Sequence, residues 1–341
     1  MFLEKENMRV GLTYDVKTDW QWQEGDPPDA NAEFDKPETI EHIAAALEFG
    51  GHTVVRIGNV QSLLRQIENL SVDIVFNICE GIRGRNRESE VPVILEMNGI
   101  PFVGSDGLTL GITLDKAVAK KCFIADGVPT PSFFVARNAD DLPQEDDLHF
   151  PLIVKTSYEG TSKGLTEASR VHDLQGLRRQ VDLITRTYHQ PALVEAFIPG
   201  MEFTVAVLGN GPYQPMPVVQ VSIDGDVDLG ERFYTFDYVT SSSLRYVCPP
   251  KISPELKQTL REMAVKAYRS VGCFDFGRVD FRVDDQGLPY VLEVNPLPSL
   301  GHDDIFNIFP RLIGSNYNEI INRILNYSCD RQGLAGGVLT S

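Results

Sequence analysis

Long apolar runs are absent from this sequence, since none reaches about 18 residues, the length that a membrane-crossing helix needs. The first residues also lack a basic segment followed by an apolar one, the pattern of a secretory signal peptide. Positive charge is scarce, because 31 Lys and Arg stand against 48 Asp and Glu and the formal net charge is −17. Binders of nucleic acid or anionic membranes present a basic face, so we expect neither partner for this chain.

Cysteine is sparse and irregularly spaced. The chain has five cysteines, an odd number, and none of them forms the C-x-x-C spacing of zinc sites and redox motifs. We therefore expect reduced thiols in a cytoplasmic protein, without a disulfide framework or a zinc site. The cysteines are Cys79, Cys122, Cys248, Cys273 and Cys329.

The first third of the chain alternates strand and helix patterns. This βαβα order predicts a doubly wound, mostly parallel sheet of the α/β class. A polar segment at 16–35, which holds both tryptophans, is predicted to be a long surface loop near the ligand end of that sheet. Strands are expected at 9–14, 53–57, 72–77 and 100–103, and helices at 37–48, 60–68 and 88–97.

Strands and helices mix in α+β fashion beyond residue 114. Two strands at 132–137 and 150–155 are expected to pair, with an acid-rich loop between them. Further strands are expected at 192–197, 203–208 and 218–223, and helices at 115–126, 173–183, 254–271 and 308–325.

The most informative stretch is 276–296, where two alternating apolar runs flank a turn signal and predict a β-hairpin. Side chains two residues apart share a face of a strand. Arg278 therefore points the same way as Asp280, and Glu293 the same way as Asn295. If the turn closes symmetrically, Arg278 lies opposite Glu293, and the four side chains converge.

Two carboxylates and a carboxamide on a rigid scaffold suit Mg²⁺, which prefers oxygen ligands and substrate phosphates. The plain alternative is a salt-bridged face that points to solvent. An Asn beside a Glu on an apolar strand, followed directly by Pro296, is poor salt-bridge design. The whole set therefore favours a metal site formed by Asp280, Glu293 and Asn295.

A glycine-containing loop follows the apolar strand that ends at Lys155. Small residues let backbone N–H groups approach an anion closely, and the hydroxyls of Thr161 and Ser162 add donors. Phosphate binding is one interpretation and an ordinary turn is the other. The Walker A spacing is absent, and no G-x-G-x-x-G opens the first helix, so a dinucleotide site is disfavoured.

Two further segments carry candidate nucleotide ligands. Lys116 begins a helix, where it could equally be a solvated side chain. An apolar strand containing Glu195 leads into a linker with Glu202, which reads either as a plain strand end or as an edge that binds adenine and ribose.

Several segments, in one order along nearly the whole chain, resemble the ATP-grasp enzymes and, within them, the D-alanine–D-alanine ligase family. Residues 99–105 (GIPFVGS) look like the family's GIPYTGS, and 159–162 (EGTS) look like its EGSS. The segments 114–116 (LDK), 277–281 (GRVDF) and 292–295 (LEVN) follow in the family's order.

The resemblance implies an α/β (α+β) ATP-grasp fold, in which a doubly wound parallel N-terminal domain precedes two α+β subdomains that clasp ATP. It also implies a homodimer. The expected division is an N-terminal substrate domain at 1–114, a central lid subdomain at 115–195, a C-terminal subdomain with the metal site at 196–330 and a disordered tail at 331–341.

The resemblance further implies a role for each matched residue. Lys116 and Lys155 would hold the phosphates of ATP, and Asp280, Glu293 and Asn295 would bind Mg²⁺, with Mn²⁺ as a substitute. The adenosine ligands would be Glu195, the main chain of Ile198, and Glu202.

The implied reaction begins with phosphoryl transfer from ATP to a substrate carboxylate. An amine then attacks the acyl phosphate. Arg278 and backbone N–H groups near Ser299 would stabilise the oxyanion, and the loop with Thr161 and Ser162 would close as a lid that excludes water.

The sequence departs from the family where the amino acids bind. The early G-x-S-x-E pattern is missing, and Asp15 follows the first strand instead. Glu80 replaces the histidine of an HG motif, and Asp304 lies in a rewritten closing segment. These residues are candidate substrate contacts.

A cationic segment at 83–87 is unusual in so acidic a chain. Arg83, Arg85 or Arg87 could grip an extra substrate carboxylate, because a guanidinium binds a carboxylate bidentately. The alternative is that these arginines balance Glu88 and Glu90 on the surface.

We therefore expect an ATP- and Mg²⁺-dependent carboxylate–amine ligase with an altered amino-acid pocket, acting on small-molecule acids and amines. One alternative is a genuine D-alanine–D-alanine or D-alanine–D-serine type ligase of cell-wall synthesis. The others are a nucleotide-binding protein without catalysis, and an enzyme that transfers the phosphoryl group but uses water or another nucleophile.

Overall fold

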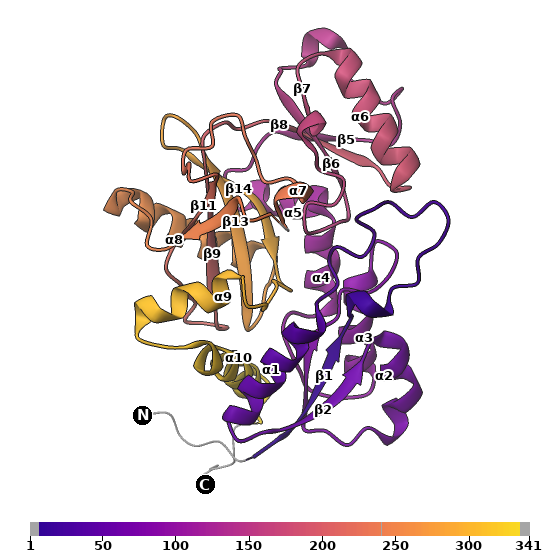
Figure 1. Cartoon of the computed structure of the whole chain (residues 1–341), viewed down its shortest axis with the longest axis vertical. Helices are drawn as coiled ribbons and strands as arrows, with labels where there is room; N and C mark the ends of the chain where they lie inside the picture. Colours follow the sequence, from indigo (N-terminus) through magenta and orange to yellow (C-terminus); the bar gives the residue numbers. More distant parts are fainter. Residues whose placement is uncertain (1–6, 240, 335–341) are drawn as a thin grey trace.

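A four-stranded parallel sheet forms the N-terminal part of the chain, as predicted (Figure 1). The computed structural model describes residues 7–239 and 241–334. The strand order is β2-β1-β3-β4, and alternate side chains of β3 pack into two different apolar cores, one on each face of the sheet. The elements are β1 (Arg9–Tyr14), α1 (Pro37–Phe49), β2 (Thr53–Gly58), α2 (Val60–Gln66), β3 (Ile74–Ile78), α3 (Glu90–Met97) and β4 (Phe102–Val103).

The second sheet is antiparallel, has four strands and an apolar core of its own, and lies in the segment expected to form the lid, so we call it the lid below. Its order is β5-β8-β6-β7, so the expected direct pairing of the first two strands is wrong, because β8 inserts between them. Two helices, α4 and α5, lead into the lid, and α6 packs on it. The bounds are α4 (Gly107–Leu114), α5 (Lys116–Ala125), β5 (Phe133–Ala136), β6 (Leu152–Thr156), β7 (Arg170–Val171), α6 (Leu174–Thr187) and β8 (Ala192–Ala196).

The third part is an antiparallel sheet with the strand order β12-β11-β9-β13-β14, and β10 pairs with β9. Helix α8 covers one face, and its apolar side joins the core of that sheet. The bounds are β9 (Met201–Leu208), β10 (Gln214–Pro215), β11 (Val219–Ile223), α7 (Phe236–Val239), β12 (Leu244–Val247), α8 (Pro254–Ser270), β13 (Phe276–Val283) and β14 (Pro289–Asn295).

The last helices pack back onto the N-terminal sheet. The helix expected at 308–325 is instead divided into α9 (Ile305–Ile308), a 3₁₀ turn and α10 (Tyr317–Arg331). The left-handed Gly314 ends the 3₁₀ turn, and the Asn316 side chain caps α10. Helices α1 and α10 share one apolar core with the N-terminal sheet and the third sheet. The N-terminal part and the third part therefore form a continuous body, whereas the lid has a core of its own.

The disordered tail that was predicted at 331–341 overlaps the end of α10. Arg331 is the last residue of α10, and its guanidinium forms an ion pair of 2.8 Å with the buried Asp275. Residues 335–341 lie outside the described residues. None of the helices in the described part of the chain combines the length and apolarity needed to cross a membrane.

The segment 16–35 is more than a surface loop. It reaches across to the lid, where the buried Asp29 carboxylate accepts hydrogen bonds from Gly164 N–H at 2.7 Å and from the Tyr188 hydroxyl at 2.9 Å. The chain therefore ties its N-terminal part to the lid through polar contacts.

Candidate active site

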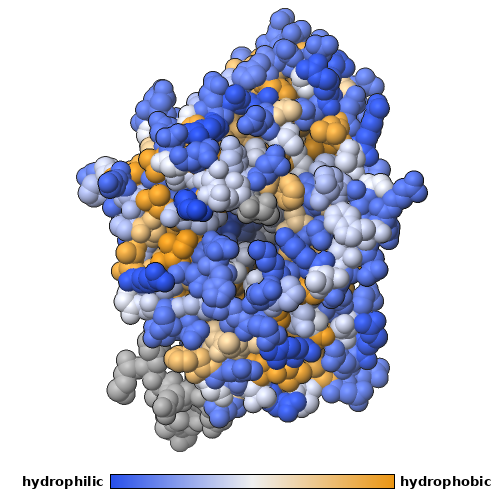
Figure 2. Space-filling model, viewed as in Figure 1, coloured by the Kyte–Doolittle hydropathy of each residue, from blue (hydrophilic) through white to orange (hydrophobic). Residues whose placement is uncertain are grey.

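A cavity of about 1230 Å³ opens where the three parts meet. The space-filling view is hollowed near the middle of this face, and hydrophilic residues surround the hollow (Figure 2). The predicted residues that line the cavity are Glu80, Lys116, Lys155, Thr161, Ser162, Glu195, Ile198, Glu202, Arg278, Asp280, Glu293, Asn295, Ser299 and Asp304.

The hairpin of β13 and β14 brings its four polar residues to one face, but the predicted register is wrong. Arg278 pairs with Asn295, and Asp280 pairs with Glu293. The turn closes one residue later than expected, and a bulge adds a second one-residue shift. Because the two shifts sum to two residues, every side chain keeps its expected face.

Asp280 lies at the centre of this group. Arg278 donates to it from Nε at 3.0 Å and from Nη2 at 2.9 Å, and Asn295 Nδ2 donates at 3.1 Å. Burial acts to lower the pKa of Arg278, but Asp280 and Asp304 raise that pKa well above its usual value. The guanidinium is therefore a permanent charge in the cavity, as an oxyanion partner must be.

Glu293 faces two lysines. Its Oε2 lies 3.6 Å from Lys116 Nζ, which also donates to the backbone carbonyl of Glu159. Burial acts to raise the pKa of Glu293, but Lys116 and Lys155 lower it below its ordinary value. The carboxylate is thus ionised at neutral pH and can act as a metal ligand.

A buried triad positions Lys155. Glu195 is 1% exposed, and its two oxygens lie 2.7 Å from Lys155 Nζ and 2.7 Å from Lys120 Nζ. Burial acts to raise the pKa of Glu195, but the two ammonium groups lower it to about 2. Sequence reasoning missed Lys120, although it lies one helical turn after Lys116.

Arg282 is a second residue that the sequence did not single out. It is 3% exposed, and it donates from Nε to the Ile198 carbonyl at 2.9 Å and from Nη1 to Glu202 at 3.2 Å. The sequence could have indicated Arg282, because it lies two residues after Asp280 and therefore on the same face of the strand. Arg282 therefore holds the linker that was predicted to bind adenosine.

The glycine loop carries strain at two positions. Thr161 and Ser162 have φ values of 49° and 54°, in the left-handed region that side-chain-bearing residues rarely adopt. Thr161 is exposed, and the Ser162 hydroxyl donates to the Tyr234 carbonyl at 3.4 Å. Such conformations gather at sites where a ligand requires them.

Glu33 fastens this loop to the N-terminal part. It accepts a hydrogen bond from Gly160 N–H, lies 3.2 Å from Lys163 Nζ and lies 2.6 Å from Arg87 Nη2. Arg87 also donates to the Tyr158 carbonyl at 2.6 Å. The predicted surface pairing of Arg87 with Glu88 and Glu90 is therefore wrong, since Arg87 is buried in this network.

Four predicted substrate contacts do not line the cavity, and Arg87, described above, is one of them. Arg83 is exposed and donates to Gln23 at 2.8 Å, and Arg85 pairs with Asp115 at 2.7 Å. Asp15 is buried and accepts from Gly81 N–H at 2.9 Å, so it shapes the turn after β3. The structure therefore gives these residues structural partners in place of a substrate.

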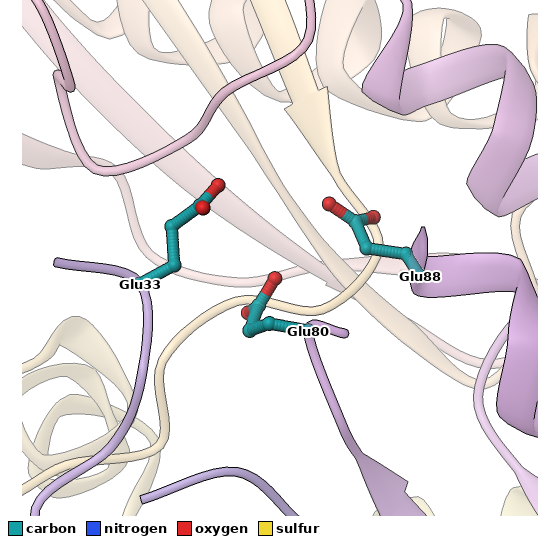
Figure 3. Close-up of side chains that lie close together, drawn as sticks. All are labelled: Glu33, Glu80 and Glu88. Atoms are coloured by element: carbon teal, nitrogen blue, oxygen red, sulfur yellow. The ribbon is translucent and has the colours of Figure 1, made fainter. Parts of the chain in front are cut away.

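Carboxylates gather at the end of the cavity next to β3. One oxygen each of Glu33, Glu80 and Glu88 lie within 4.8 Å of one another, and the side chains point toward a common centre (Figure 3). Burial, followed by the influence of Glu88, raises the pKa of Glu80 well above its ordinary value. Burial likewise raises the pKa of Glu88 to about 7, although Arg87 opposes it.

Asp304 lies on the other side of Arg278, with its Oδ2 at 3.7 Å from Nη1. Burial raises the pKa of Asp304 to about 6 even though Arg278 acts to lower it. A carboxyl group of this kind can exchange a proton near neutral pH.

Comparison with known proteins points to one family. A family model described as "D-ala D-ala ligase C-terminus" matches residues 123–326. The chain is 34% identical over 305 residues to the uncharacterised protein y4sG of Sinorhizobium fredii, covering 87% of this chain and 89% of that protein. It is 33% identical over 287 residues to D-alanine–D-alanine ligase of Syntrophotalea carbinolica, covering 83% and 88%. A solved structure of D-alanine–D-alanine ligase from Bacillus anthracis, in complex with ATP, has a similar fold, with a TM-score of 0.74, 22% identity and coverage of 96% and 100%.

Proposed function

Since the chain belongs to the D-alanine–D-alanine ligase family of ATP-grasp enzymes, which form C–N bonds, we propose that it joins a carboxylic acid to an amine through an acyl phosphate, in an altered amino-acid pocket. The convergence of Arg278, Asp280, Glu293 and Asn295 beside Lys116 in one cavity is the observation that carries this proposal. Nothing in the fold requires four polar side chains on that face. The grouping also speaks against a nucleotide-binding protein without catalysis.

The donor set fits a divalent cation. Asp280, Glu293 and Asn295 offer two carboxylates and an amide oxygen on adjacent, hydrogen-bonded strands. Hard cations such as Mg²⁺ take oxygen ligands of this kind and share them with substrate phosphates. Bound there, the ion would neutralise charge on the transferring phosphoryl group.

The lysines supply the remaining positive charge for a triphosphate. Lys155 is held toward the cavity by Glu195, and Lys116 lies beside Glu293. The glycine loop around Thr161 would cover the phosphates. Strained backbone of the kind seen in this loop is common where a loop holds a ligand. Adenosine would contact the linker that Arg282 holds through the Ile198 carbonyl and Glu202.

In the proposed reaction, an oxygen of the substrate carboxylate attacks the γ-phosphorus and the bond to the β-phosphate oxygen breaks, which yields ADP and an acyl phosphate. The amine nitrogen then attacks the acyl carbon, and inorganic phosphate leaves. Arg278 stabilises the oxyanion that forms between these events. Asp304 is placed to receive the proton that the attacking nitrogen loses.

The departures from the family pattern support an altered amino-acid pocket. Glu80 stands where the family has histidine, and Asp304 lies in the rewritten closing segment; both line the cavity. A genuine D-alanine–D-alanine ligase is the second candidate, because a relative with that name is 33% identical. The resemblance also favours a cytoplasmic location and a homodimer. Light scattering after gel filtration would test the homodimer.

The test is an ADP-release screen of acid and amine pairs with Mg²⁺, followed by mass spectrometry of the product. We expect release that needs both an acid and an amine, with one amide formed per ADP. Hydroxylamine should trap the acyl phosphate as a hydroxamate. Release with an acid and water alone would refute ligation, and turnover with D-alanine alone would refute the altered pocket.

A further inference from the structure

We propose that a second cavity, apart from the candidate active site, binds a small organic anion with an apolar body. This cavity has a volume of about 1100 Å³. Pockets that hold small molecules usually measure about 300–1,000 Å³, so its size suits such a ligand. It lies between α8, α10 and the segment 213–218, and none of the described residues that line it also lines the candidate active site. A ligand bound here therefore leaves the proposed ATP site free.

One wall of the second cavity is apolar. It contains the side chains of Met216 and Val218, which are buried. Met216 N–H donates to the Ala206 carbonyl of β9 at 2.8 Å, so this wall is fixed to the third sheet. Prolines extend the apolar surface at Pro215, Pro217, Pro249 and Pro250. A wall of this kind packs against the apolar part of a ligand.

Positive charge gathers on the helical walls of the cavity. Lys257 and Arg261 lie four residues apart on α8 and therefore on one face of that helix, and Arg323 lies on α10. Glu319 is the only acidic residue among the described residues that line the cavity. It accepts a hydrogen bond from the Ser315 hydroxyl at 2.7 Å and forms no ion pair with these three cations. In a chain with a formal net charge of −17, this local excess of positive charge favours an anion.

The basic side chains keep donors free for a ligand. Lys257 is half-buried, and its ammonium group forms no hydrogen bond or ion pair with any described residue. Arg261 donates from Nη2 to the Pro215 carbonyl at 3.0 Å, and Arg323 donates from Nε to the Tyr327 hydroxyl at 3.1 Å. A guanidinium group has five N–H donors, so both arginines retain others. Carboxylate and phosphate groups accept charge-assisted hydrogen bonds from such donors.

Other kinds of ligand fit the cavity less well. A divalent cation needs several oxygen ligands, but the charged side chains here are mostly cationic and repel it. Inorganic phosphate would use the basic side chains and leave the apolar wall without a partner. An aromatic or branched apolar body that carries one carboxylate or phosphate group satisfies both the wall and the donors.

The test measures the binding of naphthalene probes to the full chain by isothermal calorimetry, with and without ADP and Mg²⁺. Naphthoate and naphthyl phosphate carry the two candidate anionic groups, naphthalenemethanol is neutral, and inorganic phosphate lacks the apolar body. Lys257→Met and Arg323→Met remove a positive charge and keep an apolar stem. Lys121→Met is the matched control, because Lys121 is exposed on α5 and lines neither cavity.

We expect naphthoate or naphthyl phosphate to bind at a single site, and the anion that binds more tightly identifies the preferred acidic group. Its Kd should change by less than about twofold when ADP and Mg²⁺ are present. The neutral alcohol and inorganic phosphate should bind at least about tenfold more weakly. Loss of a charge-assisted hydrogen bond should raise the Kd of the anion roughly tenfold in Lys257→Met and in Arg323→Met, whereas Lys121→Met should match the wild type.

Several results would overturn the second site. These are no binding of either anion, equally tight binding of the neutral alcohol, displacement of the anion by ADP and Mg²⁺, or an unchanged Kd in both variants. A wild-type dimer that Lys257→Met or Arg323→Met dissociates, seen by light scattering, would make the cavity an interface between copies instead. Thermal unfolding checks that each variant is folded, and the second variant decides if the first is not. Because calorimetry measures binding alone, the outcome does not depend on the proposed ligase function.

Discussion

The buried triad of Lys120, Glu195 and Lys155 offers a sharp test of how the cavity is held together. We consider Glu195→Gln, which keeps the shape of the side chain and removes its charge. Each lysine lies 2.7 Å from a Glu195 oxygen in the wild type, and Lys120 and Glu195 are each 1% exposed. The variant therefore removes the ion-pair partner of the buried Lys120 ammonium group and of the half-buried Lys155 ammonium group.

Two routes give the size of the effect. Removal of one partner from a buried ion pair costs about 3–5 kcal/mol of unfolding free energy. The pKa of Glu195, lowered to about 2 from an ordinary value near 4.5, corresponds to about 3 kcal/mol of stabilisation. We therefore expect Glu195→Gln to lose about 3 kcal/mol at pH 7.

The dependence on pH has a definite sign. A carboxyl group whose pKa is lowered by folding stabilises the protein above its ordinary pKa, and that stabilisation is lost as the pH falls toward the folded value. By pH 3.5, one pH unit below the ordinary pKa of a glutamate, the unfolding free energy of the wild type should have lost roughly 1.4 kcal/mol of its excess over that of the variant. The gap between wild type and variant should narrow accordingly.

Urea denaturation followed by circular dichroism, at a series of pH values between 7 and 3.5, measures both quantities. Glu145→Gln is the control, because Glu145 is exposed on a 3₁₀ turn of the lid loop. The control should match the wild type within about 0.5 kcal/mol. A Glu195→Gln variant as stable as the wild type, or a gap that widens in acid, would refute this view of the triad.

Further predictions concern the cavity and its surroundings. Asp280→Asn and Glu293→Gln should each reduce ADP release by at least about a hundredfold while the unfolding temperature stays near that of the wild type, and unchanged turnover would contradict the metal site. Asp304→Asn should lower kcat and remove the rise of kcat through about pH 6, since only the ionised carboxyl group accepts a proton; an unaltered pH profile would exclude Asp304 as the base. Glu33→Gln should make the loop at 157–164 more sensitive to limited proteolysis, because Arg87 and Lys163 lose the charged partner that ties them to the N-terminal part, and unchanged cleavage would argue against Glu33 as a fastening residue. Arg83→Ala should leave the KM values within about twofold, because Arg83 lies outside the cavity, and a large rise would restore it as a substrate contact.

The period of two residues along β13 and β14 was enough to predict a shared face for the four polar residues. It did not predict their register, because a bulge is one extra residue and leaves no mark in an alternating pattern. The two one-residue errors add up to a shift of two residues, and an even shift leaves every side chain on its predicted face.

The networks that hold the cavity were harder to foresee. Glu33 meets Lys163, and Lys120 meets Glu195, across long stretches of sequence, so local patterns do not show these pairs. The arginines at 83–87 are the opposite case. Their unusual local composition suggested that they bind a ligand, but Arg85 pairs with Asp115 and Arg87 pairs with Glu33, and both partners are distant in the sequence. Tertiary contacts decide which charged side chains reach a cavity and which form ion pairs outside it.

The most direct test of the proposed chemistry is a crystal structure of the full chain with ADP and Mg²⁺. We expect the ion between the diphosphate and the side chains of Asp280, Glu293 and Asn295, with Lys116 and Lys155 on the phosphates. A nucleotide bound elsewhere, or an ion that contacts none of these three side chains, would contradict the assignment of this cavity as the site of phosphoryl transfer.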